Sequence, residues 1–127
     1  MSRYRILYAD DHEANRLLIK TFLVKADCDV DLVVDGEEAI QAEAEQEYDL
    51  IILDISMPKK NGIEAARSIR EREKTADEAA KPIVTLTALS DDNTREECRL
   101  AGIDHFLTKP ATKSVLMDNL RMFLPDL

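Results

Sequence analysis

Short β-type runs alternate with helical patterns five times along this chain, and this alternation restricts the fold more than any other feature. The strand-like runs are residues 4–9, 29–34, 50–53, 83–87 and 105–108. Between them, apolar residues recur with the spacing of amphipathic helices. Because parallel strands are joined by helical crossovers, this order predicts an α/β fold: a doubly wound, parallel five-stranded sheet with helices on both faces.

Local signals mark several expected helix ends. Asp35 suits the N-cap of the second helix, and Glu38 follows three places later, close to a capping box. Gly102 fits a C-cap after the fourth helix. Residues 71–81 are rich in charge and alanine, and we expect them to prolong the third helix and then to loop to Pro82.

Composition limits the classes of protein to which the chain can belong. Its 127 residues, 45% of them hydrophobic, predict one soluble domain over residues 1–127. The net charge of −9 repels nucleic acid and membrane surfaces, so we expect no direct binding to either. The N-terminal residues lack a secretory signal, which indicates the cytoplasm, and Cys28 and Cys98 are then expected to be reduced, buried thiols.

Polar side chains follow four of the predicted strands at the point where each strand ends. Asp10 and Asp11 follow the first strand, Asp54 follows the third, Thr87 ends the fourth and Lys109 follows the fifth. The carboxyl ends of parallel strands share one edge of the sheet, where α/β proteins bind ligands. We therefore expect three carboxylates, one hydroxyl and one ammonium to converge there.

Three carboxylates in one place need more positive charge than Lys109 supplies. Two like charges at about 4 Å repel by roughly 4 kcal/mol at an effective dielectric constant near 20. Carboxylates and a backbone carbonyl are hard oxygen ligands, which favour magnesium or manganese over zinc. The acidic cluster therefore predicts a site for Mg²⁺, with Mn²⁺ as a second suitable ion.

The chemistry that fits this set is phosphoryl transfer. Asp54 can attack phosphorus as a nucleophile if a metal and a cation neutralise the charge of the transferring group. Thr87 can donate a hydrogen bond to a phosphoryl oxygen, and Lys109 can pair with another. The sequence shows no histidine or serine triad, and we expect His12 and His105 to be solvated or interface residues.

These motifs closely resemble the receiver domain of two-component response regulators, over essentially the whole chain. The resemblance is carried by Asp10-Asp11, the apolar run ending in Asp54, Met57-Pro58 with Gly62, Thr87-Ala88 and Lys109-Pro110. It implies a flavodoxin-like (βα)5 fold with strand order 2-1-3-4-5. It also implies that Asp54 accepts a phosphoryl group from a histidine kinase or a histidine phosphotransfer protein. The sequence around Asp54 is similar to that of receiver domains in hybrid histidine kinases.

The resemblance also implies roles at the metal. Asp11 and Asp54 would be direct magnesium ligands, with the backbone carbonyl of Ser56 as a third, and Asp10 would act through water. The chain would then be a signalling phosphoacceptor rather than an enzyme, limited to its own phosphorylation and slow dephosphorylation.

Other residues are implicated in the switch that the resemblance implies. Thr87 would move to bond the phosphoryl group, and Lys109 would bridge its oxygens. Phe106 would swing inward as the switch aromatic, but a core ring on the last strand is an equally good interpretation of this residue. The peptide between Lys109 and Pro110 would be cis. The fourth helix, fifth strand and fifth helix would form the reporting face, which is also a surface for phosphorylation-dependent dimerisation.

Three other functions share parts of this pattern. A phosphohydrolase of the haloacid dehalogenase type would carry a second acid two places after its nucleophile, where this chain has Ser56. A flavin or nucleotide module would carry a glycine-rich loop after the first strand. A receiver acting only as a scaffold is disfavoured because every acceptor-site residue is present. The sequence leaves open the cognate kinase, the downstream effector or tethered kinase, and whether the receiver stands alone.

Overall fold

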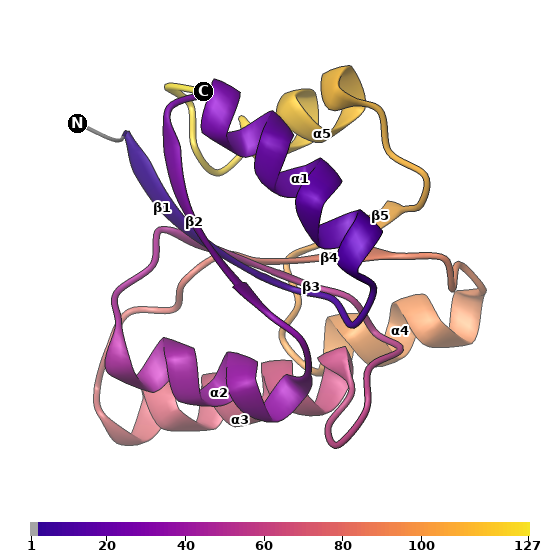
Figure 1. The fold of residues 1–127 in the computed structure, drawn as a ribbon. Helices are drawn as coiled ribbons and strands as arrows, with labels where there is room; N and C mark the ends of the chain where they lie inside the picture. The colour runs from indigo at the N-terminus through magenta and orange to yellow at the C-terminus, as the bar shows by residue number, and fades with distance from the viewer. Residues whose placement is uncertain (1–2) are drawn as a thin grey trace.

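A computed structural model describes residues 3–127, which form a parallel sheet covered by helices on both faces (Figure 1). The strands are β1 (Tyr4–Ala9), β2 (Cys28–Val33), β3 (Leu50–Leu53), β4 (Ile83–Thr87) and β5 (His105–Thr108). The helices are α1 (Glu13–Lys25), α2 (Gly36–Glu45), α3 (Gly62–Thr75), α4 (Asp92–Leu100) and α5 (Lys113–Leu120). The strand order β2-β1-β3-β4-β5 confirms the predicted flavodoxin-like topology.

Strand bounds agree with the sequence except at β2. This strand begins one residue earlier than predicted, at Cys28, and ends at Val33. The reason is its register, because Cys28 pairs with Tyr4 at the start of β1 and Val33 pairs with Ala9 at its end. The ladder to β1 therefore determines where β2 starts and stops.

Both faces of the sheet are buried under helices. Helices α1 and α5 cover one face, and α2, α3 and α4 cover the other (Figure 1). Side chains alternate between the two cores along each strand, so that Ile6 and Ile52 face α1 and α5 while Leu7 and Ile51 face the other layer. Burial on both faces explains why residues 50–53 are apolar without interruption.

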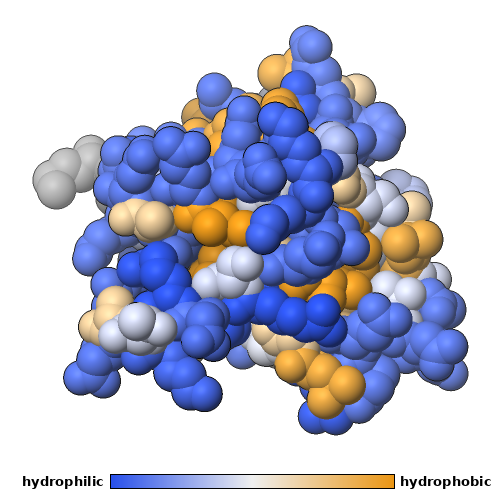
Figure 2. Space-filling model, turned by 90° about the horizontal axis from the view of Figure 1, so that it is seen from below, coloured by the Kyte–Doolittle hydropathy of each residue, from blue (hydrophilic) through white to orange (hydrophobic). Residues whose placement is uncertain are grey.

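The outside of the α2, α3 and α4 layer is mostly hydrophilic. Figure 2 shows the molecule from below this layer, with apolar residues visible between hydrophilic ones. Among residues 3–127, no helix combines the length and the apolar character needed to cross a lipid bilayer.

Most of the predicted helix ends are correct. The Asp35 side chain accepts a hydrogen bond from the Glu38 N–H at 2.8 Å, although the Glu38 carboxylate bonds the Val34 N–H instead of closing a box on Asp35. A complete capping box, which we did not predict, begins α3 at Asn61. Gly102 follows α4 with a φ of +91°, and the chain loops after α3 ends at Thr75, both as expected.

A buried ion cluster joins α2, α3 and the loop before β4. The Glu43 carboxylate accepts from Arg72 Nε at 2.6 Å and from Lys81 Nζ at 3.1 Å. Burial by itself would raise the pKa of Glu43, but the bonds from Arg72 and Lys81 outweigh it and hold that pKa below its ordinary value. The cluster fixes the charged segment that had no apolar pattern of its own.

Gly62 brings α3 against the end of β3. The Gly62 N–H donates to the Ile55 carbonyl at 3.0 Å, and a Cβ at residue 62 would lie only 2.1 Å from the Asp54 carbonyl oxygen. Glycine is therefore required where α3 begins, and the backbone of Asp54 is held by this contact.

We expect the substitution Gly62→Ala to lower the free energy of unfolding by about 1–3 kcal/mol, because the added methyl group must displace backbone. Urea denaturation followed by circular dichroism measures the change. Arg67→Ala, at an exposed position of the same helix, is the control and should stay within about 0.5 kcal/mol of the wild type. Equal stability of Gly62→Ala and wild type would contradict the close contact.

Candidate functional site

Four neighbouring strands deliver polar side chains to one edge of the sheet. Asp10 and Asp11 follow β1, Asp54 follows β3, Thr87 ends β4 and Lys109 follows β5. Because β1, β3, β4 and β5 are consecutive and parallel in the sheet, their carboxyl ends lie together. The structure thus brings together the residues that the sequence placed at this edge.

Lys109 joins the two buried carboxylates of the site. Its Nζ lies 2.7 Å from Asp10 Oδ2 and 2.9 Å from Asp54 Oδ2. Asp10 is fully buried and Asp54 is 4% exposed. Burial tends to lower the pKa of the Lys109 ammonium, but its bonds to the two carboxylates raise that pKa above its ordinary value. The ammonium therefore stays charged where it compensates two acids.

Asp10 has two further donors. The Tyr8 hydroxyl donates to Asp10 Oδ2 at 2.6 Å, and the His12 backbone N–H donates to Oδ1 at 2.9 Å. Burial would raise the pKa of the Asp10 carboxyl, but the bonds from Lys109, Tyr8 and the His12 N–H lower it below its ordinary value. The sequence analysis missed Tyr8, although its place two residues before Asp10 puts both side chains on one face of the chain.

Asp11 completes the acidic cluster at its exposed side. Its carboxylate lies 3.0 Å from His12 Nδ1, and both side chains reach solvent, as predicted for His12. One ligand atom from each of Asp10, Asp11, His12 and Asp54 can be chosen so that all lie within 4.8 Å of one another. The three carboxylates fit a hard divalent cation such as Mg²⁺. His12 also lies in this cluster, although the sequence analysis did not include it among the candidate metal ligands.

An open cleft of about 220 Å³ leads to Asp54. Its walls come from the ends of β3, β4 and β5 and from the start of α1: His12, Asn15, Asp54, Ser56, Thr87, Ala88, Leu89 and Lys109. Thr87 is 1% exposed, and its hydroxyl oxygen accepts a weak hydrogen bond from the Leu89 N–H at 3.3 Å. Its O–H is left to donate to a group bound at Asp54.

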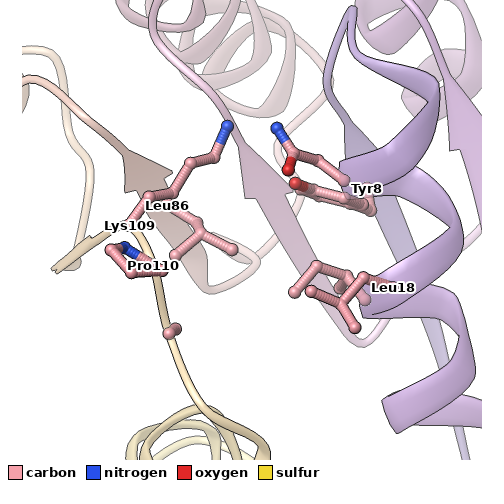
Figure 3. A pocket seen from close by; sticks show the side chains of 8 residues that line it. Tyr8, Leu18, Leu86, Lys109 and Pro110 are labelled. Carbon is pink, nitrogen blue, oxygen red and sulfur yellow. The ribbon is translucent and has the colours of Figure 1, made fainter.

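A smaller pocket lies on the other side of Lys109, between α1 and the loop after β5. Figure 3 shows Tyr8 and Leu18 on one wall, and Leu86, Lys109 and Pro110 on the other. The peptide between Lys109 and Pro110 is cis, as predicted. The Lys109 side chain therefore lines both the cleft at Asp54 and this smaller pocket.

Phe106 lies apart from the cleft, on β5 beneath α4. The Arg95 guanidinium is 4.5 Å from the centre of its ring, and the ring also packs against the core on the α2, α3 and α4 side. His105 lies beside it in sequence and contacts Asn119 of α5 at 2.8 Å. Cys28 and Cys98 are free and buried, as predicted.

Residues 6–121 match the family model of the response regulator receiver domain. The chain belongs to this family. The match covers all five helices, the strands β2 to β5 and most of β1, so the acidic edge, the cleft and Lys109 all lie within the matched receiver domain.

Similar proteins include much longer ones. The sensor protein EvgS of Escherichia coli K12 is 41% identical over 115 residues, a stretch that covers 91% of this chain but only 9% of EvgS. The match therefore concerns one receiver domain within a protein many times longer than this chain.

Two solved structures bear on the site. The receiver domain of the sensor histidine kinase PA1611 of Pseudomonas aeruginosa has a magnesium ion in its active-site cleft. Its sequence is 32% identical to this chain, and the two structures superpose with a TM-score of 0.86 over 96% of this chain and 98% of that one. The Saccharomyces cerevisiae receiver domain of Ssk1 was solved in complex with the histidine phosphotransfer protein Ypd1. Its sequence is 29% identical to this chain, with a TM-score of 0.89 over 97% of this chain and 91% of that one.

We expect millimolar Mg²⁺ to raise the melting temperature of this chain, because the ion relieves repulsion within the acidic cluster. At a hundredfold excess over the dissociation constant the gain is about 2.7 kcal/mol. Thermal unfolding with Mg²⁺ and with EDTA measures it. Asp11→Asn should remove most of the gain, while Asp118→Asn, an exposed acid on α5, should keep it. A melting temperature that is the same with Mg²⁺ and with EDTA would contradict the assignment of the cluster as a metal site.

Proposed function

We propose that this chain, as one receiver domain over residues 1–127, accepts a phosphoryl group on Asp54 from a phosphohistidine donor in a magnesium-dependent reaction. The observation that supports this most is the Asp54 carboxylate itself, which opens on the cleft with Lys109 Nζ at 2.9 Å. In this proposal the chain is a signalling phosphoacceptor. It catalyses its own phosphorylation and slow dephosphorylation and acts on no separate substrate.

The transfer is one substitution at phosphorus. A carboxylate oxygen of Asp54 attacks, the bond from phosphorus to the donor's imidazole nitrogen breaks, and its electron pair returns to the imidazole. Asp11, Asp54 and the Ser56 carbonyl would hold Mg²⁺ directly, and Asp10 would hold it through water. When bound, the ion neutralises charge on the phosphoryl oxygens, and Mn²⁺ suits the same ligands.

Phosphorylation then changes what Lys109 and Thr87 contact. The new group adds about −1.5 to −2 charges and three strong acceptor oxygens beside the Lys109 ammonium. Thr87 is buried in the cleft wall, and its O–H can donate only if it turns towards the group. A state in which both residues face the phosphoryl group is therefore favoured over the state described above.

Movement of Thr87 would be reported through Phe106. Both residues lie on neighbouring strands, and Phe106 is half-buried under Arg95 rather than enclosed in the core. An inward swing of the ring would reshape the surface of α4, β5 and α5. We propose this surface as the output face, available to a downstream effector, a tethered kinase or a second phosphorylated copy.

The phosphodonor would approach over α1. Leu17 and Leu18 are about half exposed there, and Leu18 borders the pocket that reaches Lys109. An apolar surface beside the cleft suits a helical partner that carries a phosphohistidine. A histidine kinase or a histidine phosphotransfer protein of the cytoplasm would fit, whether joined to this receiver or separate from it.

We expect wild-type protein to take up phosphate from acetyl phosphate with Mg²⁺, and Asp54→Asn to reduce uptake to background because the nucleophile is gone. Radiolabel or intact-mass measurement detects the adduct, which hydroxylamine should cleave because it is an acyl phosphate. Asp118→Asn is the matched control and should label at the wild-type rate. Labelling of Asp54→Asn at that rate would refute the assignment.

The same assay separates the alternatives. Continuous release of phosphate from simple phosphomonoesters, beyond one equivalent, would favour a hydrolase of the haloacid dehalogenase type. Failure of wild-type protein to label with any donor, including a phosphorylated histidine phosphotransfer protein, would favour a scaffold receiver.

We expect Arg95→Ala to raise the population with Phe106 turned inward, because the outer position loses a cation–π contact worth about 0.5–1 kcal/mol. That energy corresponds to a shift of about two- to fivefold in the unphosphorylated protein. Phe106 ring signals in NMR spectra, recorded with and without beryllofluoride, report the two positions. Arg99→Ala, which breaks the pair with Glu96 on the same helix and leaves the Arg95 contact over Phe106 in place, should leave the ratio unchanged. An unshifted Arg95→Ala spectrum would contradict this prediction.

A further inference from the structure

We propose that Tyr8 is a positioning residue of this receiver: it keeps Asp10 hydrogen-bonded and in place when Lys109 leaves Asp10 for the phosphoryl group on Asp54. The inference rests on the proposed function, because it concerns what happens to Asp10 once Asp54 is phosphorylated. In this inference Tyr8 acts through Asp10, to which its hydroxyl donates.

One oxygen of Asp10 has two donors. Tyr8 Oη lies 2.6 Å from Asp10 Oδ2, and Lys109 Nζ lies 2.7 Å from the same oxygen. Figure 3 shows that Tyr8 and Lys109 come from opposite walls of the pocket between α1 and the loop after β5. Asp10 is therefore supported from two separate segments, β1 and the loop after β5.

Only one of these donors is free to leave. Lys109 has a flexible side chain whose Nζ is already 2.9 Å from Asp54 Oδ2, so a phosphoryl group on Asp54 would form within its reach. The doubly charged group attracts the ammonium more strongly than a single carboxylate does. Movement of Lys109 towards the phosphoryl group would lengthen or break its bond to Asp10.

Tyr8 cannot follow. Its ring is fully buried in the core beneath α1 and α5, where it packs with Ile19 and Leu86 among others. The hydroxyl is thus held at Asp10 by packing and not by the charge on Lys109. After Lys109 departs, Asp10 Oδ2 keeps the Tyr8 bond and Oδ1 keeps the His12 N–H bond.

Without Tyr8, the departure of Lys109 would leave Asp10 Oδ2 buried with no protein donor among residues 3–127. An unpaired buried carboxylate oxygen is costly, so the phosphorylated state would lose stability relative to the unphosphorylated one. In the unphosphorylated state Lys109 stays bonded to Asp10, so the missing Tyr8 hydrogen bond leaves Asp10 Oδ2 with one donor. Removing the Tyr8 hydroxyl should therefore penalise the phosphorylated state selectively.

The chain contains a second phenol–carboxylate pair outside the site, with a carboxylate side chain that is 42% exposed. Tyr48 Oη lies 2.6 Å from Asp31 Oδ2, the same length as the bond between Tyr8 and Asp10, and Tyr48 is also buried. Tyr48→Phe removes the same kind of hydrogen bond without touching the cleft. It separates a loss of general stability from a loss specific to the phosphorylated state.

The test measures binding of beryllofluoride, a phosphoryl mimic, to Mg²⁺-loaded protein by isothermal titration calorimetry. We expect Tyr8→Phe to weaken binding by about tenfold, the effect of one hydrogen bond to a charged group. Tyr48→Phe should bind like wild type. In an Asp10→Ala background, Tyr8→Phe should cause little further change, because Tyr8 acts through Asp10. Equal affinities of wild type and Tyr8→Phe, or an undiminished effect without Asp10, would overturn the inference.

A crystal structure of the wild-type complex with Mg²⁺ and beryllofluoride tests the same idea without a variant. The inference requires Lys109 Nζ on the mimic and Tyr8 Oη still within hydrogen-bond distance of Asp10. Lys109 still on Asp10, or Tyr8 turned away, would overturn it. If wild-type protein binds no beryllofluoride at all, the proposed function itself fails, whereas wild-type binding with an unaffected Tyr8→Phe rejects only the role of Tyr8.

Discussion

The ammonium of Lys109 lies between two buried carboxylates, and the arrangement of the site depends on this contact. Asp10 and Asp54 come from β1 and β3, which are adjacent, while Lys109 arrives from β5 across the end of β4. Two buried acids side by side would repel each other and lack solvation, so neither is stable there without the cation. The contact therefore requires that all four strands end at the same edge.

The same contact makes the site responsive to charge. One ammonium shared by two acids can be redistributed by a third anionic group at little structural cost, because only a side chain must move. Groups held by packing, such as the Tyr8 hydroxyl and the His12 backbone N–H, keep Asp10 in place meanwhile. In the proposed switch, donors held by packing beside a cation on a flexible side chain would let the cleft change partners without unfolding.

The layers below the cleft supply this rigidity. Gly62 lets α3 approach the backbone of Asp54, and the cluster around Glu43 ties α2 and α3 to the segment that leads into β4. Both features lie on the α2, α3 and α4 side, away from the pocket between α1 and Pro110. The contacts that hold the backbone around the cleft thus lie on one face of the sheet. The other face, beside α1, carries the exposed Leu17 and Leu18 and the pocket.

The resemblance to receiver domains implied the strand order. The sequence by itself predicted the alternation of strands and helices, the acidic edge and the candidates Asp10, Asp11, Asp54, Thr87 and Lys109. These follow from short-range patterns: burial of a strand on both faces needs an unbroken apolar run, and a polar residue at its end is visible in one segment. Only the tertiary structure decided which groups touch. Tyr8 on Asp10, Arg72 on Glu43, Arg95 over Phe106 and the place of His12 in the cluster all depend on side-chain direction and packing between elements. Hydrogen bonds and ion pairs act over about 3 Å, and a linear pattern does not locate atoms that closely across elements.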